Sequence, residues 1–383
     1  MMPGWMVDAF FWLVFPVAVL EGIRVARSER KRQRRELATA LGYGSLELVL
    51  LAMCAATASP LLLAGLIALR MLVLFVRERQ VWGRAVIKTL LIGAALVLLA
   101  VVGDVASFVD SPTASIAEGW RVAIISLVGI ACIVAVVPVQ VGDEPKDTLA
   151  APLAFIAFAR VALPLGAAES QFAVVVPIVA AVVSLVCALW LLSAGARANH
   201  FEPSTLVSEL LVCERGVVLS FVWMGLASGE HLAGVGALLE WWAGTLALLA
   251  LEASLRRRPL PKPMAFFALA MAVSLPGTVG FVAEDLLAHG LLELRPLLAA
   301  AFVGVAAINA AALYLAIVNI IVDLRAQPRP QGQLHSQPDE LRPSLMMLSA
   351  AGLSLLLGLV PRPFVTAATA AHEAIVLHPV VHH

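Results

Sequence analysis

Charged side chains are scarce in this sequence, and neither sign is in excess. The 383 residues include 26 lysines and arginines and 26 aspartates and glutamates, so 14% of the chain is charged and the formal net charge is zero. A neutral chain offers no large basic surface for nucleic acid. Hydrophobic residues make up 61% of the sequence, and the mean hydropathy is +0.95. This composition predicts an all-α polytopic membrane protein, because a water-soluble domain cannot bury so much apolar surface.

Cysteine is also rare, and the motifs of several enzyme classes are missing. The four cysteines lie singly in apolar segments, without a CxxC pair. This spacing does not favour disulfides, zinc sites or iron–sulfur clusters. The sequence has no P-loop, HExxH or GxSxG motif, so nothing in it supports nucleotide hydrolysis or serine or zinc chemistry. We therefore expect this chain to bind no metal.

Long apolar runs separated by turn residues predict about twelve transmembrane helices. The expected spans are residues 8–26, 37–58, 60–77, 87–107, 121–141, 149–166, 171–195, 205–227, 232–254, 264–286, 294–323 and 343–361. Lysine and arginine gather in alternate loops, such as RVARSERKRQRRE after the first span, whereas the loops between them hold almost none. The positive-inside rule then places the basic loops in the cytoplasm and both termini on the other side of a cell inner membrane.

One apolar run contains a break that suggests a family. The stretch SLPGTVGFVAEDLL places Pro276 and Gly277 inside a hydrophobic segment, and Glu284 follows them about two helical turns later. This stretch resembles GLPGTxGFVGEF, a segment of the antiporter-like proton-channel subunits of respiratory complex I and of related cation–proton antiporters. In that family the segment forms a discontinuous helix whose break exposes backbone groups near a charged channel residue. The resemblance implies the channel role for Glu284.

Further segments extend this resemblance to most of residues 60–365. Residues 130–166 resemble the family's other broken helix and the helix after it, with Pro138 at the family's proline. The stretch FEPSTLVSELLVCERGVVLSFVWMG places Glu214 where the family has a histidine. The resemblance implies an antiporter-like inverted-repeat bundle with two discontinuous helices. It also implies partner subunits, both membrane and peripheral, and no redox cofactor in this chain.

The sequence departs from the family pattern at several charged positions. The stretch LLEWWAGTLALLAL has Trp241 at a family histidine and Thr245 at a family lysine. Arg160 is the base nearest to another family lysine, and Arg70 is the ionisable residue nearest to its partner glutamate. Two spans near the start of the family pattern are missing. The chain is therefore divided into a shortened N-terminal part, an antiporter-like bundle and a C-terminal tail, residues 1–58, 59–365 and 366–383.

Charged residues within spans are the candidates for a proton or ion pathway, because a charge in lipid costs roughly 2.5–3.5 kcal/mol or more. The candidate pathway residues are Glu284, Glu214, Arg160, Lys88, Glu240 and Arg70. Lys88 lies one residue inside its expected span, where a lysine also snorkels to the membrane surface. Pro276, Gly277 and Pro138 mark the expected helix breaks.

Each of the main candidates also has a structural interpretation. Glu284 carries protons or is the fixed partner of an arginine, Arg160 or Arg215. Arginine is always protonated in proteins, so Arg160 either tunes a nearby carboxylate or forms a permanent salt bridge. Glu214 relays protons or belongs to an internal ion-pair cluster with Glu209 and Arg215.

Three functional hypotheses follow from these residues and from the resemblance. In the first, the chain is a membrane subunit of a complex I-like or antiporter-like assembly. It translocates protons or Na⁺, or supports a neighbouring subunit that does so. It would then be a non-catalytic membrane part, and the resemblance includes assemblies of the NADH:quinone oxidoreductase kind. In the second, it is a degenerate scaffold subunit that does not conduct. In the third, it is a stand-alone secondary transporter.

Overall fold

Every regular element in the described part of the chain is a helix. The computed structural model describes residues 8–30, 46, 49–57, 60–77, 125, 150–166, 171–197, 203–255, 262–326 and 345–377. The prediction of an all-α membrane fold is confirmed. The expected span 87–107 lies outside the described residues, and so does the span 121–141 except for Ile125.

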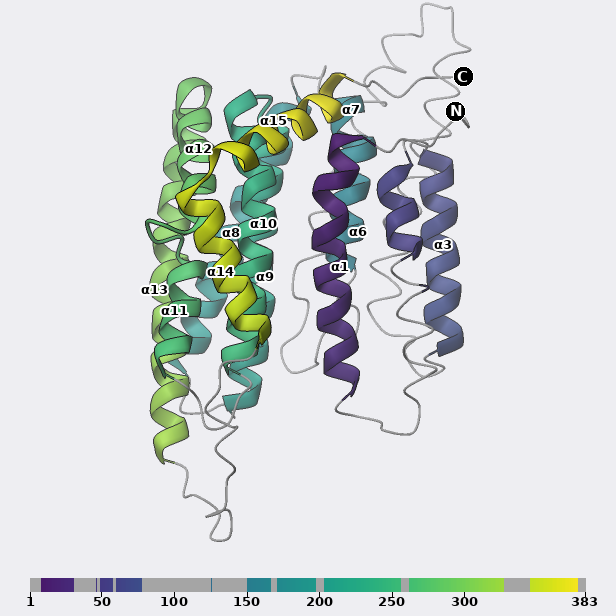
Figure 1. Cartoon of the computed structure of the whole chain (residues 1–383). Helices are drawn as coiled ribbons and strands as arrows, with labels where there is room; N and C mark the ends of the chain where they lie inside the picture. The colour runs from purple at the N-terminus through teal and green to yellow at the C-terminus, as the bar shows by residue number, and fades with distance from the viewer. Residues whose placement is uncertain are drawn as a thin grey trace, which may run out of the picture.

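Two groups of helices lie side by side (Figure 1). The amino-terminal group contains a short helical stretch at residues 49–56 and the elements α1 (Ala9–Arg30), α3 (Pro60–Arg77), α6 (Ala150–Ala157), the π-helix η1 (Phe158–Ala162) and α7 (Leu163–Gly166). The carboxyl-terminal bundle contains α8 (Phe172–Ala196), α9 (Pro203–Ala227), α10 (His231–Leu255), α11 (Lys262–Ala272), α12 (Val279–Leu294), α13 (Pro296–Ala326) and α14 (Leu345–Leu359). The last helix, α15 (Arg362–Leu377), lies across one end of the molecule.

Four helices of the carboxyl-terminal bundle are long and apolar enough to cross a membrane. They are Phe172–Ala196, Thr205–Ala227, His231–Leu255 and Pro296–Val322, with mean hydropathies between 1.5 and 2.9. A helix of 25 residues is about 37 Å long, which exceeds the roughly 30 Å of a bilayer's hydrocarbon core. These four helices coincide closely with four of the spans expected from the sequence. The chain is therefore a membrane-embedded protein.

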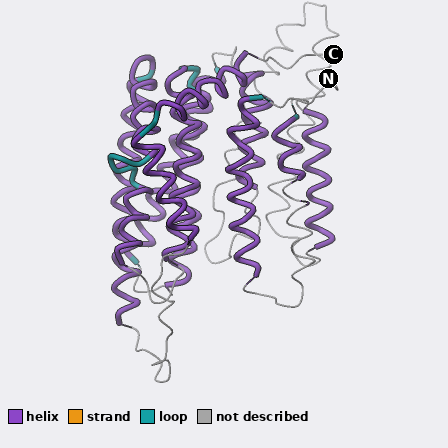
Figure 2. The backbone as a smooth tube through the Cα atoms, in the orientation of Figure 1, coloured by secondary structure: helices purple, strands orange, loops and turns teal. Residues whose placement is uncertain are grey.

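A short irregular segment separates α11 from α12 (Figure 2). It contains Pro276, which has no amide hydrogen to continue a helix. Ser274 and Gly277 have positive φ angles of 53° and 95°, a backbone region that glycine adopts without strain. Helix α12 then starts at Val279, and the side chain of the preceding Thr278 accepts a hydrogen bond from the Phe281 amide at 3.4 Å and so caps the new helix. The span expected at 264–286 is thus two helices joined by a non-helical turn.

Helix α15 meets α14 at an angle of 88° and packs against α1, α7 and α10. Ala368, Ala371, His372 and Ile375 are buried, and their spacing places them on one face of the helix. Helix α15 extends into the segment 366–383, which we predicted from the sequence to be a C-terminal tail. It contacts both the amino-terminal group and the carboxyl-terminal bundle, as α10 does through its contact with α1 (Figure 1).

Candidate functional site

Three glutamates lie near the middle of three neighbouring helices of the carboxyl-terminal bundle. Glu214 is on α9, Glu240 is on α10 and Glu284 is on α12. Glu214 and Glu240 lie roughly 15 Å from the nearer end of their helices, and Glu284 lies about 8 Å into α12, beyond the break. We call Glu214, Glu240 and Glu284 the acidic cluster.

Two glycines on α10 explain how three separate helices bring these glutamates together. A Cβ atom at Gly236 would lie 2.8 Å from the backbone oxygen of Ala283 on α12, and one at Gly244 would overlap the side chain of Val218 on α9. Only a glycine lets α10 approach both neighbours so closely. Glu240 lies one helical turn from each glycine and on the same face of α10. The close approach therefore holds Glu240 between the helices that carry the other two members of the cluster.

Two members of the acidic cluster are buried, the third is half-buried, and the three act on one another electrostatically. The exposed fraction is 1% for Glu214 and 4% for Glu240, and Glu284 is half-buried. The charge of Glu284 acts on both of the others. The Asn309 amide on α13 donates from Nδ2 to Glu214 Oε2 at 2.8 Å, and the Ser274 hydroxyl lies within hydrogen-bonding reach of Glu284. Glu240 Oε2 has no hydrogen-bond partner among the described residues.

The acidic cluster has no basic partner within the described part of the chain. Three ionised carboxylates buried side by side would be very unfavourable, because each loses its hydration and each repels the others. Among the residues that the structure describes, no three acidic, histidine or cysteine side chains are arranged to hold a metal ion. Protons on the carboxyl groups are therefore the simplest way to neutralise the cluster.

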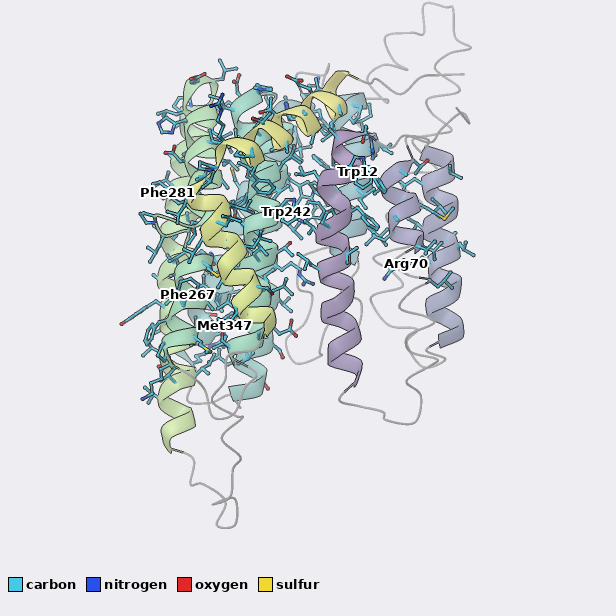
Figure 3. The ribbon with its side chains drawn as sticks, in the orientation of Figure 1. Trp12, Arg70, Trp242, Phe267, Phe281 and Met347 are labelled. Atoms are coloured by element: carbon cyan, nitrogen blue, oxygen red, sulfur yellow. The ribbon has the colours of Figure 1, made fainter. Side chains whose placement is uncertain are left out.

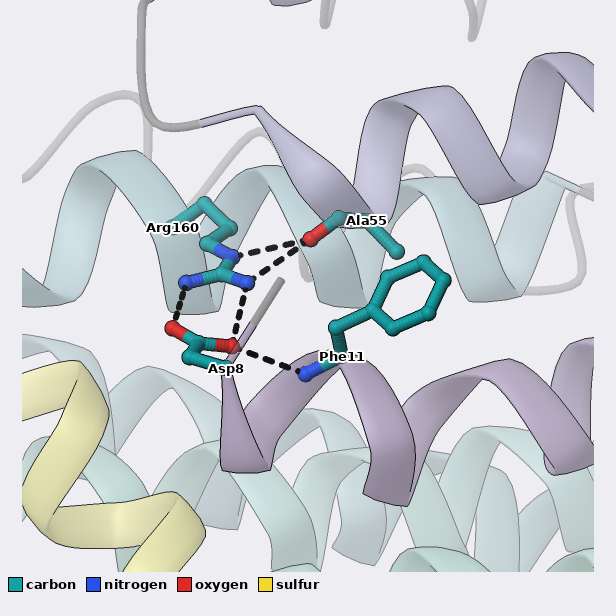
Figure 4. Close-up of polar contacts among 4 residues, drawn as sticks. All are labelled: Asp8, Phe11, Ala55 and Arg160. Atoms are coloured by element: carbon teal, nitrogen blue, oxygen red, sulfur yellow. Dashed lines mark hydrogen bonds and ion pairs between the residues drawn. The ribbon is translucent and has the colours of Figure 1, made fainter. Parts of the chain in front are cut away.

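Arg160 is not part of this cluster, because it is bound in the amino-terminal group (Figure 4). Its Nη1 and Nη2 atoms donate to the two carboxylate oxygens of Asp8 at 2.6 and 2.8 Å. Its Nε and Nη2 atoms also donate to the carbonyl oxygen of Ala55 at 3.0 and 2.8 Å. The guanidinium carbon lies 4.5 Å from the centre of the Phe10 ring. Of the two roles left open for Arg160, the structure thus shows a salt bridge.

Local features of the sequence place both partners of this salt bridge. Asp8 precedes α1, and its Oδ1 atom accepts a hydrogen bond from the Phe11 amide at 3.0 Å, as a helix cap does. Arg160 lies in η1, where the Leu163 amide donates to the carbonyl of Phe158, five residues earlier. The next residue is Pro164, whose ring has no amide hydrogen and crowds the carbonyl four residues before it. This crowding is a physical reason for the wider turn that carries Arg160.

Aromatic side chains fill the boundary between the two groups of helices. The rings of Phe155 on α6 and Trp241 on α10 have centroids only 3.9 Å apart. Trp242, which is labelled in Figure 3, donates from Nε1 to the carbonyl of Leu13 on α1 at 3.0 Å. Both tryptophans directly follow Glu240 in the sequence. The position where the family has a histidine is therefore an apolar contact in this chain, beside the acidic cluster.

The remaining candidate residues lie away from the acidic cluster or outside the described residues. Arg70 is buried on α3, in the amino-terminal group, and its charge acts on Cys54 (Figure 3). Lys88 and Pro138 lie outside the described residues. The structure thus brings together the three glutamates of the six candidate pathway residues and leaves both arginines in the other group of helices.

Sequence reasoning missed three residues that interact with the candidate residues. Asp8 could have been recognised as a helix cap immediately before an apolar run. Asn309 is a lone amide in the apolar stretch GVAAINAAALYL, which is a signal in itself, because such a group needs a hydrogen-bond partner in lipid. Ser274 immediately precedes Leu275 and Pro276 at the break, but nothing in the sequence places its hydroxyl near Glu284.

The described part of the chain combines a bundle of spanning helices, an interrupted helix and glutamates within the bundle. Buried ionisable groups beside an interrupted helix, within a bundle of spanning helices, are typical of ion-translocating membrane proteins. No protein-family model and no curated protein matches the sequence.

Solved structures show a more particular similarity. A chain of respiratory complex I from Thermus thermophilus with bound NADH superposes with a TM-score of 0.68 and 20% identity, covering 98% of this chain and 87% of that chain. A chain of the Mrp complex from Dietzia sp. DQ12-45-1b gives a TM-score of 0.64 and 15% identity, covering 96% of this chain and 84% of that chain. A chain of respiratory complex I from Thermus thermophilus with bound Aureothin gives a TM-score of 0.64 and 18% identity, covering 97% of this chain and 88% of that chain. The antiporter-like fold implied by the sequence resemblance is confirmed.

Proposed function

We propose that this chain is a membrane subunit of a larger assembly of the complex I or Mrp kind, and that it moves protons through the acidic cluster. The observation that carries this proposal is the set of three carboxyl groups, two buried and one half-buried, without a basic partner among the described residues. The shared fold supports the assembly part of the proposal, because both similar structures are multi-subunit complexes by name.

Carboxyl groups suit proton transfer because each exists in a charged and a neutral form. A proton that leaves Glu284 for Glu240 or Glu214 exchanges one neutral and one charged carboxyl group, and the net charge of the cluster stays the same. Such a step avoids the cost of adding a further buried charge. The same argument does not apply to a fixed arginine, which keeps its charge.

The interruption between α11 and α12 supports the same function. Non-helical turns in membrane helices leave backbone groups free to bind water or ions, and transporters place them beside their ion sites. Here the turn supplies Ser274, whose hydroxyl reaches Glu284. Gly358 on α14 packs directly on the backbone of the turn, where any side chain would clash with Gly277 and Thr278. The turn is thus held in place beside the cluster.

The proposal is tested with the full chain, purified together with the subunits that accompany it and reconstituted into liposomes that contain a pH-sensitive dye. A potassium gradient with valinomycin supplies the driving potential, and the initial rate of proton uptake is measured. Glu284→Gln cannot carry a proton and should lower the rate at least about tenfold. Asp285→Asn is the matched control, because Asp285 is adjacent but exposed and lies beside His289; its rate should stay within about twofold of the parent.

An unchanged rate in Glu284→Gln would contradict the proposal. Uptake of labelled Na⁺ without proton movement would replace the proton by sodium as the transported ion. Proton uptake by the chain after removal of its partners would favour the stand-alone transporter.

A second candidate function, the non-conducting scaffold, is favoured by one observation. The base nearest to a family channel lysine, Arg160, is bound to both oxygens of Asp8 and to Ala55, so it is not free to take part in proton transfer. In this alternative the whole chain serves as a support for neighbouring subunits. Equal proton uptake by assemblies carrying the parent chain and the Glu284→Gln variant is the result that the scaffold requires.

A further inference from the structure

Asn309 brings an amide to the acidic cluster from a helix that carries none of its acids. It lies on α13, which packs against both α9 and α12, and its exposed fraction is 6%. Its Nδ2 atom donates to Glu214 Oε2 at 2.8 Å. Its Oδ1 atom is buried and has no hydrogen-bond partner among the described residues. Burying an amide in an apolar environment costs free energy unless both its donor and its acceptor are hydrogen-bonded. The buried Oδ1 atom is therefore available to accept a hydrogen bond from a further donor.

The chemistry of the amide fits both protonation states of its partner. An ionised carboxylate only accepts hydrogen bonds, whereas a protonated carboxyl group can also donate one. The Asn309 side chain has a donor end, Nδ2, and an acceptor end, Oδ1. Rotation about its terminal side-chain bond exchanges the two ends, because that torsion is broad and roughly two-fold. The same side chain can therefore bind Glu214 with and without its proton.

We propose that Asn309 is a positioning residue that holds Glu214 in one orientation through both of its protonation states. The inference rests on the proposed function of the acidic cluster. When a proton moves from the carboxyl group of Glu284 to Glu214, one O–H bond breaks, one forms, and the negative charge moves the opposite way. Before the transfer Nδ2 of Asn309 donates to Glu214. After it the new O–H group of Glu214 donates to Oδ1 of Asn309.

This arrangement explains why Glu214 needs a partner that is not a base. A lysine or arginine at the same place would hold Glu214 permanently ionised, because breaking a buried ion pair is costly. An aliphatic residue would leave the ionised form without a donor among the described residues. An amide supports both forms and lets the proton move on.

The test compares Asn309→Leu with a matched control on the same helix, Asn319→Leu. Asn319 also donates from its amide, but to the carbonyl oxygen of Gly195 at 2.7 Å. Both substitutions remove one amide hydrogen bond and keep a similar volume. The full chain in lipid is titrated by infrared spectroscopy, and the carboxyl C=O band of Glu214 is identified as the band that Glu214→Gln removes.

The expected result is specific to Asn309. A donor to a charged oxygen is worth more than a bond to the neutral form, so the protonated band of Glu214 should persist to a pH about one unit higher in Asn309→Leu. In Asn319→Leu the band should titrate as in the parent chain. Proton uptake of the reconstituted assembly should fall about tenfold in Asn309→Leu and change little in the control.

Asn309→Asp is a second variant of nearly the same shape, in case the leucine variant does not fold. It loses the amide donor, so the Glu214 band should again persist to higher pH. A Glu214 band that titrates identically in the parent, Asn309→Leu and Asn309→Asp overturns the inference. If Glu284→Gln abolishes proton uptake while Asn309→Leu conducts normally, the proposed function stands and the role of Asn309 falls. If the parent assembly does not conduct, the proposed function falls, and the infrared titration still decides whether Asn309 controls Glu214.

Discussion

In the amino-terminal group a buried charge meets its counter-charge, whereas in the carboxyl-terminal bundle buried carboxyl groups meet one another. Arg160 is bound by both oxygens of Asp8, and their side chains are 4% and 14% exposed. In the carboxyl-terminal bundle, Glu214 has an amide as its partner, and Glu240 leaves one oxygen without a partner among the described residues. Both regions keep ionisable groups away from water, but they neutralise them by different means.

The difference separates a fixed ion pair from carboxyl groups that have no basic partner among the described residues. An arginine–carboxylate pair with two parallel hydrogen bonds is rigid and keeps both charges at all ordinary pH values. Buried carboxyl groups without a base are neutral only when they carry protons. The aromatic contact of Phe155 with Trp241 marks the boundary between the two regions. We therefore expect chemically similar substitutions to change the free energy of unfolding in opposite directions in the two regions.

The largest effect on stability is expected in the amino-terminal group. Asp8→Asn leaves Arg160 buried without its counter-charge and should lower the free energy of unfolding by about 2–3 kcal/mol, somewhat less than for a fully buried pair. The measurement is unfolding in mixed detergent micelles, followed by circular dichroism. Proton uptake per folded molecule should stay within about twofold of the parent, because the acidic cluster is untouched.

The control for this substitution removes both charges at once. Asp8→Leu combined with Arg160→Met leaves no uncompensated charge and should recover most of the lost stability. A loss of proton uptake in Asp8→Asn at unchanged stability would mean that the salt bridge belongs to the pathway, and the contrast between the two regions would disappear.

An intermediate effect is expected at α15, which joins the two regions. Burial, assisted by the neighbouring His231, lowers the pKa of His372 to about 4 from its ordinary value of 6.5. His372 therefore stays neutral in the folded protein while the unfolded chain binds a proton as the pH falls. Folding stability should decrease between about pH 6.5 and pH 4, by about 2 kcal/mol at pH 5. His372→Leu should remove this part of the acid sensitivity.

The measurement for His372 is the difference in unfolding free energy between about pH 7.5 and pH 5, for the parent and the variant. Comparison of the two proteins cancels the contribution of all other titratable groups. An acid sensitivity that is the same in His372→Leu and the parent would show that α15 is not held through this histidine.

The smallest effect, and the opposite sign, is expected in the acidic cluster. Glu240→Gln replaces a buried acid, one oxygen of which has no partner among the described residues, by an amide that never ionises. The free energy of unfolding should rise by about 1 kcal/mol, whereas Asp8→Asn lowers it. Proton uptake should fall with Glu240→Gln despite the higher stability. A clear destabilisation would indicate a partner that makes Glu240 structural.

Hydropathy alone located the long helices of the carboxyl-terminal bundle, since each needs about twenty apolar residues to cross a bilayer. The expected spans 171–195, 205–227 and 232–254 agree closely with α8, α9 and α10. Hydropathy did not locate α15, because an amphipathic helix of 16 residues at the end of a bundle has no long apolar run. The break near Pro276 and Gly277 was visible because both residues disfavour a continuous helix.

The candidate site was only partly predictable. Glu214, Glu240 and Glu284 stood out because a charge inside an apolar span is unusual. The partner of Arg160 was not predictable, since Asp8 lies 152 positions earlier in the chain. Asn309 lies 95 positions from Glu214, and no sequence spacing connects them.

The sequence by itself determined that the chain lies in a membrane, where its main helices run, and which acids are buried in them. These properties follow from composition and from local helix rules, which act over a few residues. Only the tertiary structure decided that Arg160 is bound to Asp8 and that α10 holds Glu240 between α9 and α12. It also decided that the Asn309 amide donates a hydrogen bond to Glu214. The partners of buried charges depend on which helices pack together, and that packing depends on close contacts such as those at Gly236 and Gly244.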